Sequence, residues 1–507
     1  MASTDIARTE KEIHERIIFL ANLRAKQNSF LPIFRLPPEI LEIIFIHGAR
    51  DHYESCNGDC FTPRIPTWVN VSYVCTHWRN VALNYPTLWT YHFNLTRRWT
   101  EELLQRSKDV PSKISCIYPD GTPGLQEAKA CAWWEGLGNL LGHIEHIQEL
   151  RMDVPRPYLP YFSLRAPRLE TLEINFRGRE QRFLEITAVH TPVLRTLKLS
   201  HCLLPWDLLN LSRLKTFSIS NVHFPSDIEF LTVLGSMRDL TALYLRPNLR
   251  DPLFSGDLAR SPQIDLPRLS LLVVSAPLST VLAFLSHVDI PLTARFSIEL
   301  ECDFGASADD SAQFYSLLAH RFTMAEQSGA IIRSLTVDTG DIVSLTWSFS
   351  ERDCRPPLPE ELDDDIPLQI MFLQFGDDDE QTCSIMADMC SCLPLTHVQT
   401  LYVRALWSST SFTQILRCLD GLRYLKLEGG CIPYLSMLSL VASEPKENSD
   451  GQPQERMLVP ALEEVELVRV HFPPGDDVGC NEMSQKSFLE VLSTRKGLRD
   501  RVIMVDC

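Results

Sequence analysis

The sequence lacks the long apolar runs that enter or cross membranes. No stretch reaches the roughly 18 uninterrupted apolar residues of a membrane-spanning helix, and residues 1–10 are polar and charged, unlike the apolar core of a signal peptide. The fifteen cysteines are scattered and form no compact disulfide framework. This usage indicates free thiols in a reducing compartment, so we expect a soluble intracellular protein that is cytoplasmic, nuclear or both.

Clusters of basic residues are also missing. The chain has 48 lysines and arginines against 65 aspartates and glutamates, which gives a formal net charge of −17. Proteins that bind nucleic acid contact phosphate groups through grouped Lys and Arg side chains. We therefore expect no nucleic-acid partner.

Motifs for catalysis and metal binding are absent as well. The sequence has no Gly-x-Ser-x-Gly, no Gly-x4-Gly-Lys-Ser/Thr and no His-Glu-x-x-His. Cys75 lies near His77, but its apolar surroundings favour a small buried hydrophobic residue over a nucleophile. His47, His52, Cys56 and Cys60 lack the tight Cys-x2-Cys pairs of zinc fingers, so an exposed loop is favoured over a zinc site. We expect no enzyme, no cofactor and no metal.

A compact set of apolar motifs occupies residues 36–89. It opens with Leu36-Pro37-Pro38, where the prolines suit the first turn of a helix. Ile40, Leu41, Ile44 and Phe45 then form an apolar stripe at helical spacing. A second helix is predicted over residues 69–82, and Pro86-Thr87-Leu88-Trp89 closes the unit. Because so short a unit buries little apolar surface alone, we expect its stripe to pack on the rest of the chain or on a partner.

These motifs resemble an F-box. The blocks Leu-Pro-x-Glu-Ile-Leu-x-x-Ile-Phe, Val-Cys-x-x-Trp-Arg-x-Val-Ala and Pro-x-Leu-Trp follow one another as in large fungal F-box families, although residues 51–67 are a longer insert than the family usually carries. The resemblance implies a small helical bundle that docks on a Skp-family adaptor and, through it, on a cullin–RING ubiquitin ligase. It assigns forming or supporting the adaptor-binding face to Leu36, Pro37, Ile40, Leu41, Ile44, Phe45, Val74, Cys75, Trp78, Leu88 and Trp89.

Two helical segments flank this unit. Residues 1–30 are predicted to contain an amphipathic helix, because Ile6, Ile13, Ile17, Leu20 and Leu23 recur at helical spacing among charged residues. Packing of this helix on the F-box or the body is favoured, with self-association as the alternative. Residues 96–150, after an F-box domain of residues 31–95, are predicted to be a mainly helical connector.

A degenerate leucine-rich repeat occupies residues 151–507. The pattern Leu-x-x-Leu-x-Leu recurs from residues 169, 194, 214 and 240, and weaker copies begin near residues 269, 332, 398, 422 and 462. Each copy predicts a short strand with inward-pointing leucines, and copies must stack because one alone cannot bury its apolar face. Pro167, Pro192, Pro267 and Pro460 mark the ends of the outer segments. Residues 351–382 are predicted to be an acidic loop around a strand candidate at 369–375, and residues 443–457 a disordered insertion.

The predicted fold class is therefore α/β: a helical F-box followed by an irregular leucine-rich-repeat solenoid with parallel strands on its concave face and helices and loops outside. The expected function is that of a substrate-recognition subunit of an SCF-type cullin–RING ubiquitin ligase, with an unknown protein substrate and no membrane or nucleic-acid partner. The alternative is a leucine-rich interaction scaffold whose F-box is decayed or independent of ubiquitination. Tyr and Arg are enriched in interface hot spots, so the candidate substrate-binding residues are Tyr244, Arg246, Tyr402, Arg404, Tyr424 and Lys426.

Overall fold

The chain is described by a computed structural model and divides into two compact units, residues 1–214 and 215–507. The boundary falls inside the range predicted to contain the repeats. The described residues are 2–55, 66–93, 96–116, 138, 140–155, 165–177, 182–183, 191–203, 211–222, 226–247, 263–301, 308–339, 343–349, 368–373, 379–404, 409–429, 441–447, 453–457, 459–470 and 502–505.

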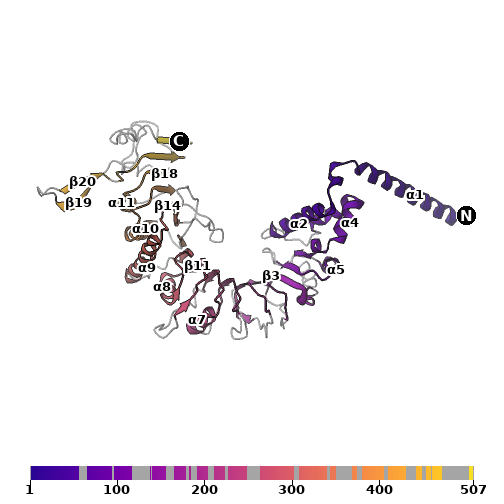
Figure 1. The fold of residues 1–507 in the computed structure, drawn as a ribbon, viewed down its shortest axis with the longest axis horizontal. Coiled ribbons are helices and arrows are strands. Elements are labelled where there is room, and N and C mark those ends of the chain that lie inside the picture. Colours follow the sequence, from indigo (N-terminus) through magenta and orange to yellow (C-terminus); the bar gives the residue numbers. More distant parts are fainter. Residues whose placement is uncertain are drawn as a thin grey trace. The chain divides into compact units, whose positions relative to one another are not determined.

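The first unit begins with helices (Figure 1). The predicted N-terminal helix is present as α1 (Ala2–Asn28), and the first F-box-like helix as α2 (Pro38–Ser55), which starts at the second proline as expected. The segment between them holds the short 3-10 helix η1 (Pro32–Arg35). Residues 51–55, expected to open an inserted loop, instead extend α2, and residues 56–65 lie outside the described residues.

The second predicted helix, residues 69–82, is not continuous, so that prediction is wrong. It is divided into η2 (Thr67–Asn70), α3 (Val71–Val74) and α4 (Thr76–Asn84). The break lies at Cys75, whose backbone is extended with φ −161° and ψ 169° and whose Sγ accepts a hydrogen bond from the backbone N–H of Trp78 at 3.4 Å. Cys75 therefore caps α4, and it is partly exposed instead of buried as expected.

One apolar core holds this helical region together. Leu41 and Phe45 of α2 pack with Leu88 and Trp89 of η3 (Pro86–Thr90), and all four side chains are almost completely buried. The same core includes Leu103 of α5 (Arg97–Ser107). The apolar stripe predicted for α2 thus does pack within the chain, but only along one side of the helix.

The rest of the first unit is a parallel sheet. The strands β1 (Tyr91–Phe93), β2 (Ser112–Cys116), β3 (Ile147–Pro155), β4 (Thr171–Arg177) and β6 (Thr196–Ser200) pair in that order. The short strands β5 (Arg182–Phe183) and β7 (Cys202–Leu203) pair with each other, and η4 (Ile144–His146) precedes β3. Residues 112–116 were expected to be helical, so the connector prediction is wrong there.

The second unit continues with a mostly parallel sheet in the order β8-β9-β11-β13-β16-β15-β14-β17-β18-β21-β22. Only β15 among these strands is antiparallel to its neighbours, β14 and β16. The bounds are β8 (Thr216–Ser220), β9 (Ala242–Arg246), β11 (Leu271–Ala276), β13 (Arg295–Glu301), β14 (Ser334–Thr339), β15 (Val343–Ser348), β16 (Leu368–Leu373), β17 (Thr400–Arg404), β18 (Tyr424–Glu428), β21 (Glu464–Val468) and β22 (Val502–Val505).

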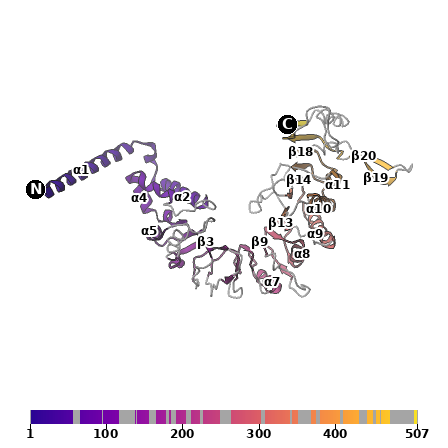
Figure 2. The ribbon, with the colours of Figure 1, turned by 180° about the vertical axis from the view of Figure 1, so that it is seen from behind.

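Helices follow one another along one face of these strands (Figures 1 and 2). They are α7 (Asp227–Gly235), α8 (Leu278–His287), α9 (Ala308–Gln327), α10 (Asp379–Cys392) and α11 (Ser409–Arg417). A two-stranded sheet of β10 (Ile264–Asp265) and β12 (Val288–Asp289) lies beside α7 and α8. The protein is therefore a mixed α/β protein with mostly parallel sheets, as the predicted class requires.

A hydrogen-bonded turn precedes many of the strands and explains the prolines. The N–H of Leu269 donates to the carbonyl of Leu266, and the same i to i+3 bond leads to Leu169, Leu194, Leu214, Leu240, Val398, Leu422 and Leu462. Pro167, Pro192, Pro267 and Pro460 all occupy the second position of this turn, where their fixed φ is favourable. The leucine at the last position of these turns is buried, as are alternate residues of the strands that follow, such as Leu197 and Leu199 after Leu194.

The predicted insertions have a mixed outcome. Residues 443–457, expected to be disordered, contribute to the antiparallel pair β19 (Val441–Glu447) and β20 (Pro453–Met457), so that prediction is wrong for these strands. The strand candidate at 369–375 is β16, shifted by one residue at its start. Most of the acidic loop, residues 351–367 and 374–378, lies outside the described residues, while residues 379–382 belong to α10. Among the described helices, none is long and apolar enough to span a membrane.

Candidate interaction surfaces

Helix α2 has two apolar sides. Leu41, Phe45 and Ala49 face the core, and each is at most 1% exposed. Ile40, Ile43 and Ile44 are 41%, 51% and 48% exposed. Positions three and four residues apart share one side of a helix, so these isoleucines form a continuous apolar stripe that the described part of the chain leaves open to solvent.

The predicted adaptor-binding residues divide between this surface and the core. Four of them are exposed: Pro37, Ile40, Ile44 and Val74. Four are buried in the core of the helical region: Leu41, Phe45, Leu88 and Trp89. Three are partly buried: Leu36, Cys75 and Trp78. The first group can touch a partner directly, whereas the buried residues can only support the surface from beneath.

Trp89 shows how the buried residues support the helices. Its indole N–H donates to the carbonyl of Ala82 at 2.7 Å, which joins η3 to the end of α4. The Trp68 ring meets it edge-on at 5.3 Å between centroids, and the Arg106 guanidinium lies 4.1 Å from the ring centroid. A buried tryptophan with its N–H paired is a strong anchor, so Trp89 fixes the arrangement of the helices that carry the exposed stripe.

Sequence reasoning missed several exposed apolar side chains in the same region. Ile43 belongs to the stripe, and Tyr73 on α3 is 67% exposed. Phe30, Leu31 and Ile33, just before α2, are 72%, 48% and 39% exposed. Ile43 was detectable from its i+3 spacing to Ile40, but Tyr73 was not, because its exposure follows from the break at Cys75.

The candidate substrate-binding residues lie on the face of the second unit opposite its buried leucines. In β9, Leu243 and Leu245 are buried while Tyr244 is partly exposed and Arg246 is exposed. The same alternation places Tyr424 and Lys426 beside the buried Leu425 and Leu427 in β18. Tyr402 departs from expectation, because it is only 4% exposed.

Four of these residues come together and two do not. The register pairs Tyr402 with Lys426 and Thr400 with Tyr424, so β17 and β18 bring Tyr402, Arg404, Tyr424 and Lys426 into one group. Tyr244 and Arg246 are on β9, and β11, β13, β16, β15 and β14 lie between β9 and β17. At about 4.8 Å per strand this separation is roughly 29 Å along the sheet.

The group on β17 and β18 is linked by ion pairs and hydrogen bonds, and we call it the strand-face network. Arg404 lies 3.3 Å from the carboxylate of Asp338, which raises the pKa of the guanidinium. The Tyr402 hydroxyl donates to Glu428, which also pairs with Arg469 at 2.7 Å. The Tyr424 hydroxyl donates to Glu466, and Lys426 lies 3.7 Å from the same carboxylate. Each tyrosine, arginine and lysine is thus already held in place by a carboxylate.

A second charged row crosses the open face of the first unit. Glu149 pairs with Lys113 at 3.7 Å and with Arg151 at 2.7 Å, and Glu173 lies 3.9 Å from Arg151 and 3.8 Å from Lys198. Tyr53 of α2 donates a hydrogen bond to Glu149 at 3.2 Å. Opposite charges therefore pair from strand to strand along this row, and the Tyr53 hydrogen bond joins α2 to it.

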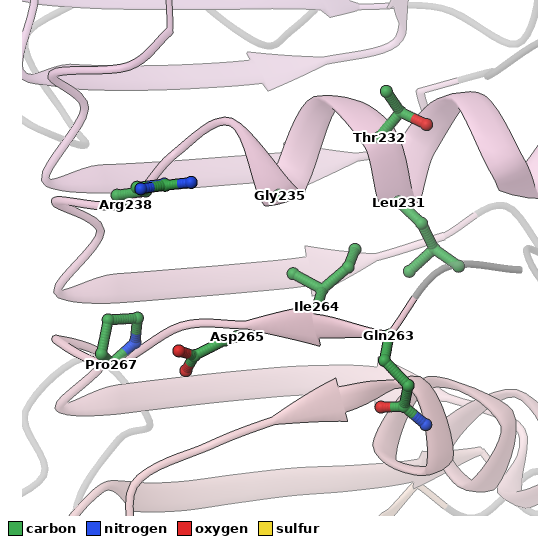
Figure 3. A pocket seen from close by; sticks show the side chains of 8 residues that line it. All are labelled: Leu231, Thr232, Gly235, Arg238, Gln263, Ile264, Asp265 and Pro267. Atoms are coloured by element: carbon green, nitrogen blue, oxygen red, sulfur yellow. The ribbon is translucent and has the colours of Figure 1, made fainter.

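A shallow depression lies between α7 and β10 (Figure 3). Its volume is about 560 Å³, and Figure 3 shows Ile264 beneath the helix with Arg238 and Asp265 towards one end. The hydroxyl of Thr232 donates to the carbonyl of Ile228 at 2.6 Å. Its lining side chains, Leu231, Thr232, Arg238, Gln263, Ile264, Asp265 and Pro267, include no histidine, cysteine or lysine to activate a nucleophile.

Burial favours the neutral forms of one histidine and two cysteines. Burial raises the pKa of the Cys116 thiol to about 12 and lowers the pKa of His92 to about 3. Burial also raises the pKa of Cys390. Within the described residues, no three His, Cys, Asp or Glu side chains are grouped as metal ligands. Cys56 and Cys60, of the zinc alternative, lie outside those residues.

Comparison with known proteins adds no assignment. A scan against protein-family models finds no match, and a search of curated proteins finds none either.

Proposed function

We propose that the protein is a substrate-recognition subunit of an SCF-type cullin–RING ubiquitin ligase. In this proposal residues 36–89 are an F-box that binds a Skp-family adaptor, and the stacked strands form a leucine-rich-repeat solenoid that binds a target protein. The chain itself performs no chemistry; it holds the target near a ubiquitin carrier and so raises the target's effective concentration.

The observation that carries the proposal is the exposed stripe of Ile40, Ile43 and Ile44 on a helix that also holds the F-box-like motif. Each of these side chains is about half exposed, so burial against a partner would contribute roughly 1 kcal/mol each. The buried Trp89 and Phe45 hold the helix in place from the other side. A rigid apolar stripe of this kind suits docking to a preformed apolar groove of an adaptor.

The strand-face network is the proposed target-binding surface. Its residues include two tyrosines and two arginines, and these residue types are enriched in interface hot spots. Arg404 and Arg469 remain 46% and 59% exposed despite their carboxylate partners. These guanidinium groups can therefore still donate hydrogen bonds to a bound protein.

Co-purification with a Skp-family adaptor from the same organism tests the proposal. We expect stoichiometric binding by the wild-type chain and at least a tenfold loss of affinity for Ile44→Asp, because a carboxylate would then be buried at the centre of the contact. The matched control is Ile228→Asp on α7, where the isoleucine is 51% exposed against 48% for Ile44. This control should bind the adaptor as the wild type does.

Ile44→Asp is a sharper variant than the double substitution Leu36→Ala with Pro37→Ala. Leu36 packs against the buried core, so its truncation would also affect folding. Failure of a folded wild-type chain to bind the adaptor would refute the ligase proposal and leave a leucine-rich scaffold. Equal binding by wild type and Ile44→Asp would refute the assignment of the stripe.

A further inference from the structure

Helix α1 carries a narrow apolar stripe along its whole length. Ile6, Ile13, Ile17 and Leu20 are 60%, 53%, 58% and 54% exposed. At 100° per residue these four side chains fall within an arc of about 60°, and their spacing of seven, four and three is that of a coiled-coil seam. The expectation that this helix packs on the F-box or the body through these residues is therefore not met in the described part of the chain.

Two opposite charges interrupt the same stripe. Glu10 lies three residues before Ile13 and Arg24 four residues after Leu20, so Arg24 falls within the arc of the apolar residues and Glu10 about 20° from its edge. Within the described residues neither side chain has an ion-pair partner. A seam with one acidic end and one basic end discriminates between partners and between orientations.

A second copy of α1 satisfies this seam in one orientation. In a parallel pair the two-fold axis runs along the helices, so Glu10 meets Glu10 of the other copy and Arg24 meets Arg24. In an antiparallel pair centred on Ile17, Ile17 meets Ile17 of the other copy and Ile13 comes beside Leu20, while Glu10 of each copy comes beside Arg24 of the other, at both ends of the contact. The antiparallel arrangement also aligns the helix dipoles favourably.

We propose that α1 pairs antiparallel with α1 of a second copy, which makes the protein a homodimer. Ile17 of both copies forms the centre of the contact, and on either side of it Ile13 of one copy packs beside Leu20 of the other. The two symmetric Glu10–Arg24 pairs set the register and the direction. The helix is 27 residues long, or about 40 Å, which gives room for these three apolar layers and for the charge pairs that flank them. The inference does not depend on adaptor binding.

The apolar part of the proposal is tested by the mass of the full-length chain in solution. Light scattering after size exclusion at micromolar concentration should give a dimer for the wild type and a monomer for Ile17→Asp. The matched control is Ile18→Asp, which introduces the same carboxylate at the next position, about 100° around the helix. Ile18 is 48% exposed and Ile17 58%, so the two substitutions differ mainly in the face they change, and Ile18→Asp should remain dimeric.

The orientation is tested by exchanging the seam charges. Glu10→Arg or Arg24→Glu alone should weaken dimerisation about tenfold, since each places like charges at both ends of the contact. The double variant Glu10→Arg with Arg24→Glu should restore the wild-type dissociation constant. In a parallel dimer neither single exchange would weaken dimerisation, because each would replace one pair of like charges by another.

Three results would overturn the inference: a monomeric wild type, equal disruption by Ile17→Asp and Ile18→Asp, or no rescue in the double charge exchange. Adaptor binding by Ile17→Asp should be unchanged, which separates this inference from the proposed function.

Discussion

His92 should make the stability of the first unit depend on pH in a way that one substitution removes. The side chain is 1% exposed in β1, and burial lowers its pKa to about 3. Both ring nitrogens lack a hydrogen-bond partner among the described residues. The folded protein therefore holds His92 neutral, whereas the unfolded chain binds a proton with the ordinary histidine pKa of about 6.5.

The sign and size of the effect follow from proton linkage. Because the unfolded state binds more protons below pH 6.5, the free energy of unfolding falls as the pH decreases, and the loss continues until the folded pKa near 3 is reached. At pH 5 the solution is about 1.5 pH units below the unfolded pKa, and each unit corresponds to about 1.4 kcal/mol. His92 should therefore cost the first unit about 2 kcal/mol between pH 7 and pH 5.

Urea unfolding of wild type and His92→Leu at pH 7, 6 and 5, followed by tryptophan fluorescence, measures this cost. Leucine is similar in size and does not titrate, so the difference in unfolding free energy between variant and wild type should grow by about 2 kcal/mol over this range. His47→Leu, which removes an exposed histidine from α2, is the control and should follow the wild type. An unchanged difference for His92→Leu would refute the claim that the folded protein excludes a proton from this ring.

Two further predictions concern stability. Arg321 of α9 donates hydrogen bonds to the carbonyls of Ile290, Pro291 and Ala294 at 3.3, 2.6 and 3.0 Å. In urea unfolding, Arg321→Met should lower the free energy of unfolding of the second unit by about 3 kcal/mol, and Arg321→Lys should lower it by less. A wild-type urea midpoint for Arg321→Met would contradict this. A Cβ at Gly421 would lie 2.7 Å from the carbonyl oxygen of Thr396, whereas a Cβ at Gly48 in α2 meets nothing within 4 Å. Gly421→Ala should therefore lower the free energy of unfolding by about 2 kcal/mol, and Gly48→Ala should raise it by about 0.5–1 kcal/mol, both measured by thermal unfolding. Changes of the same sign in the two variants would refute this contrast.

The sequence pattern located many of the strands because alternation of apolar and polar residues follows burial. Alternation in β4, β6, β8, β9, β18 and β21 places one leucine or other apolar residue in every second position on the buried face. The proline in the turn before several of these strands is an independent local signal, since its φ suits the second turn position. Periodicity and turn chemistry therefore agree, and they locate these strands without knowledge of their partners.

Some strands were missed although their sequences alternate between apolar and polar residues. In β13, Phe296, Ile298 and Leu300 alternate with polar residues, but the turn before the strand ends in Ala294 instead of the leucine that opens the repeat pattern. The strand β15 runs antiparallel between β14 and β16. Its direction is set by long-range pairing, which a local pattern cannot report.

The candidate adaptor surface was predicted as a set of residue types but not as a surface. The motif identified the helix that carries the exposed stripe, but it could not separate Ile44, which is exposed, from Phe45, which belongs to the core. That separation depends on where Trp89 and Leu88 pack against α2. It also depends on the break at Cys75, which a continuous apolar pattern conceals.

The strand-face arginines have a structural role that any test of target binding must take into account. Arg404 covers the side chain of Asp338, which is 5% exposed, and Arg246 covers Glu299, which is 8% exposed. Removing either arginine would leave a buried carboxylate without its cation, which is strongly destabilising. A loss of binding in Arg404→Ala could then arise from folding alone. Substituting Arg404→Ala together with Asp338→Asn removes both charges, so only this pair of changes separates the guanidinium's contact with a target from its support of the sheet.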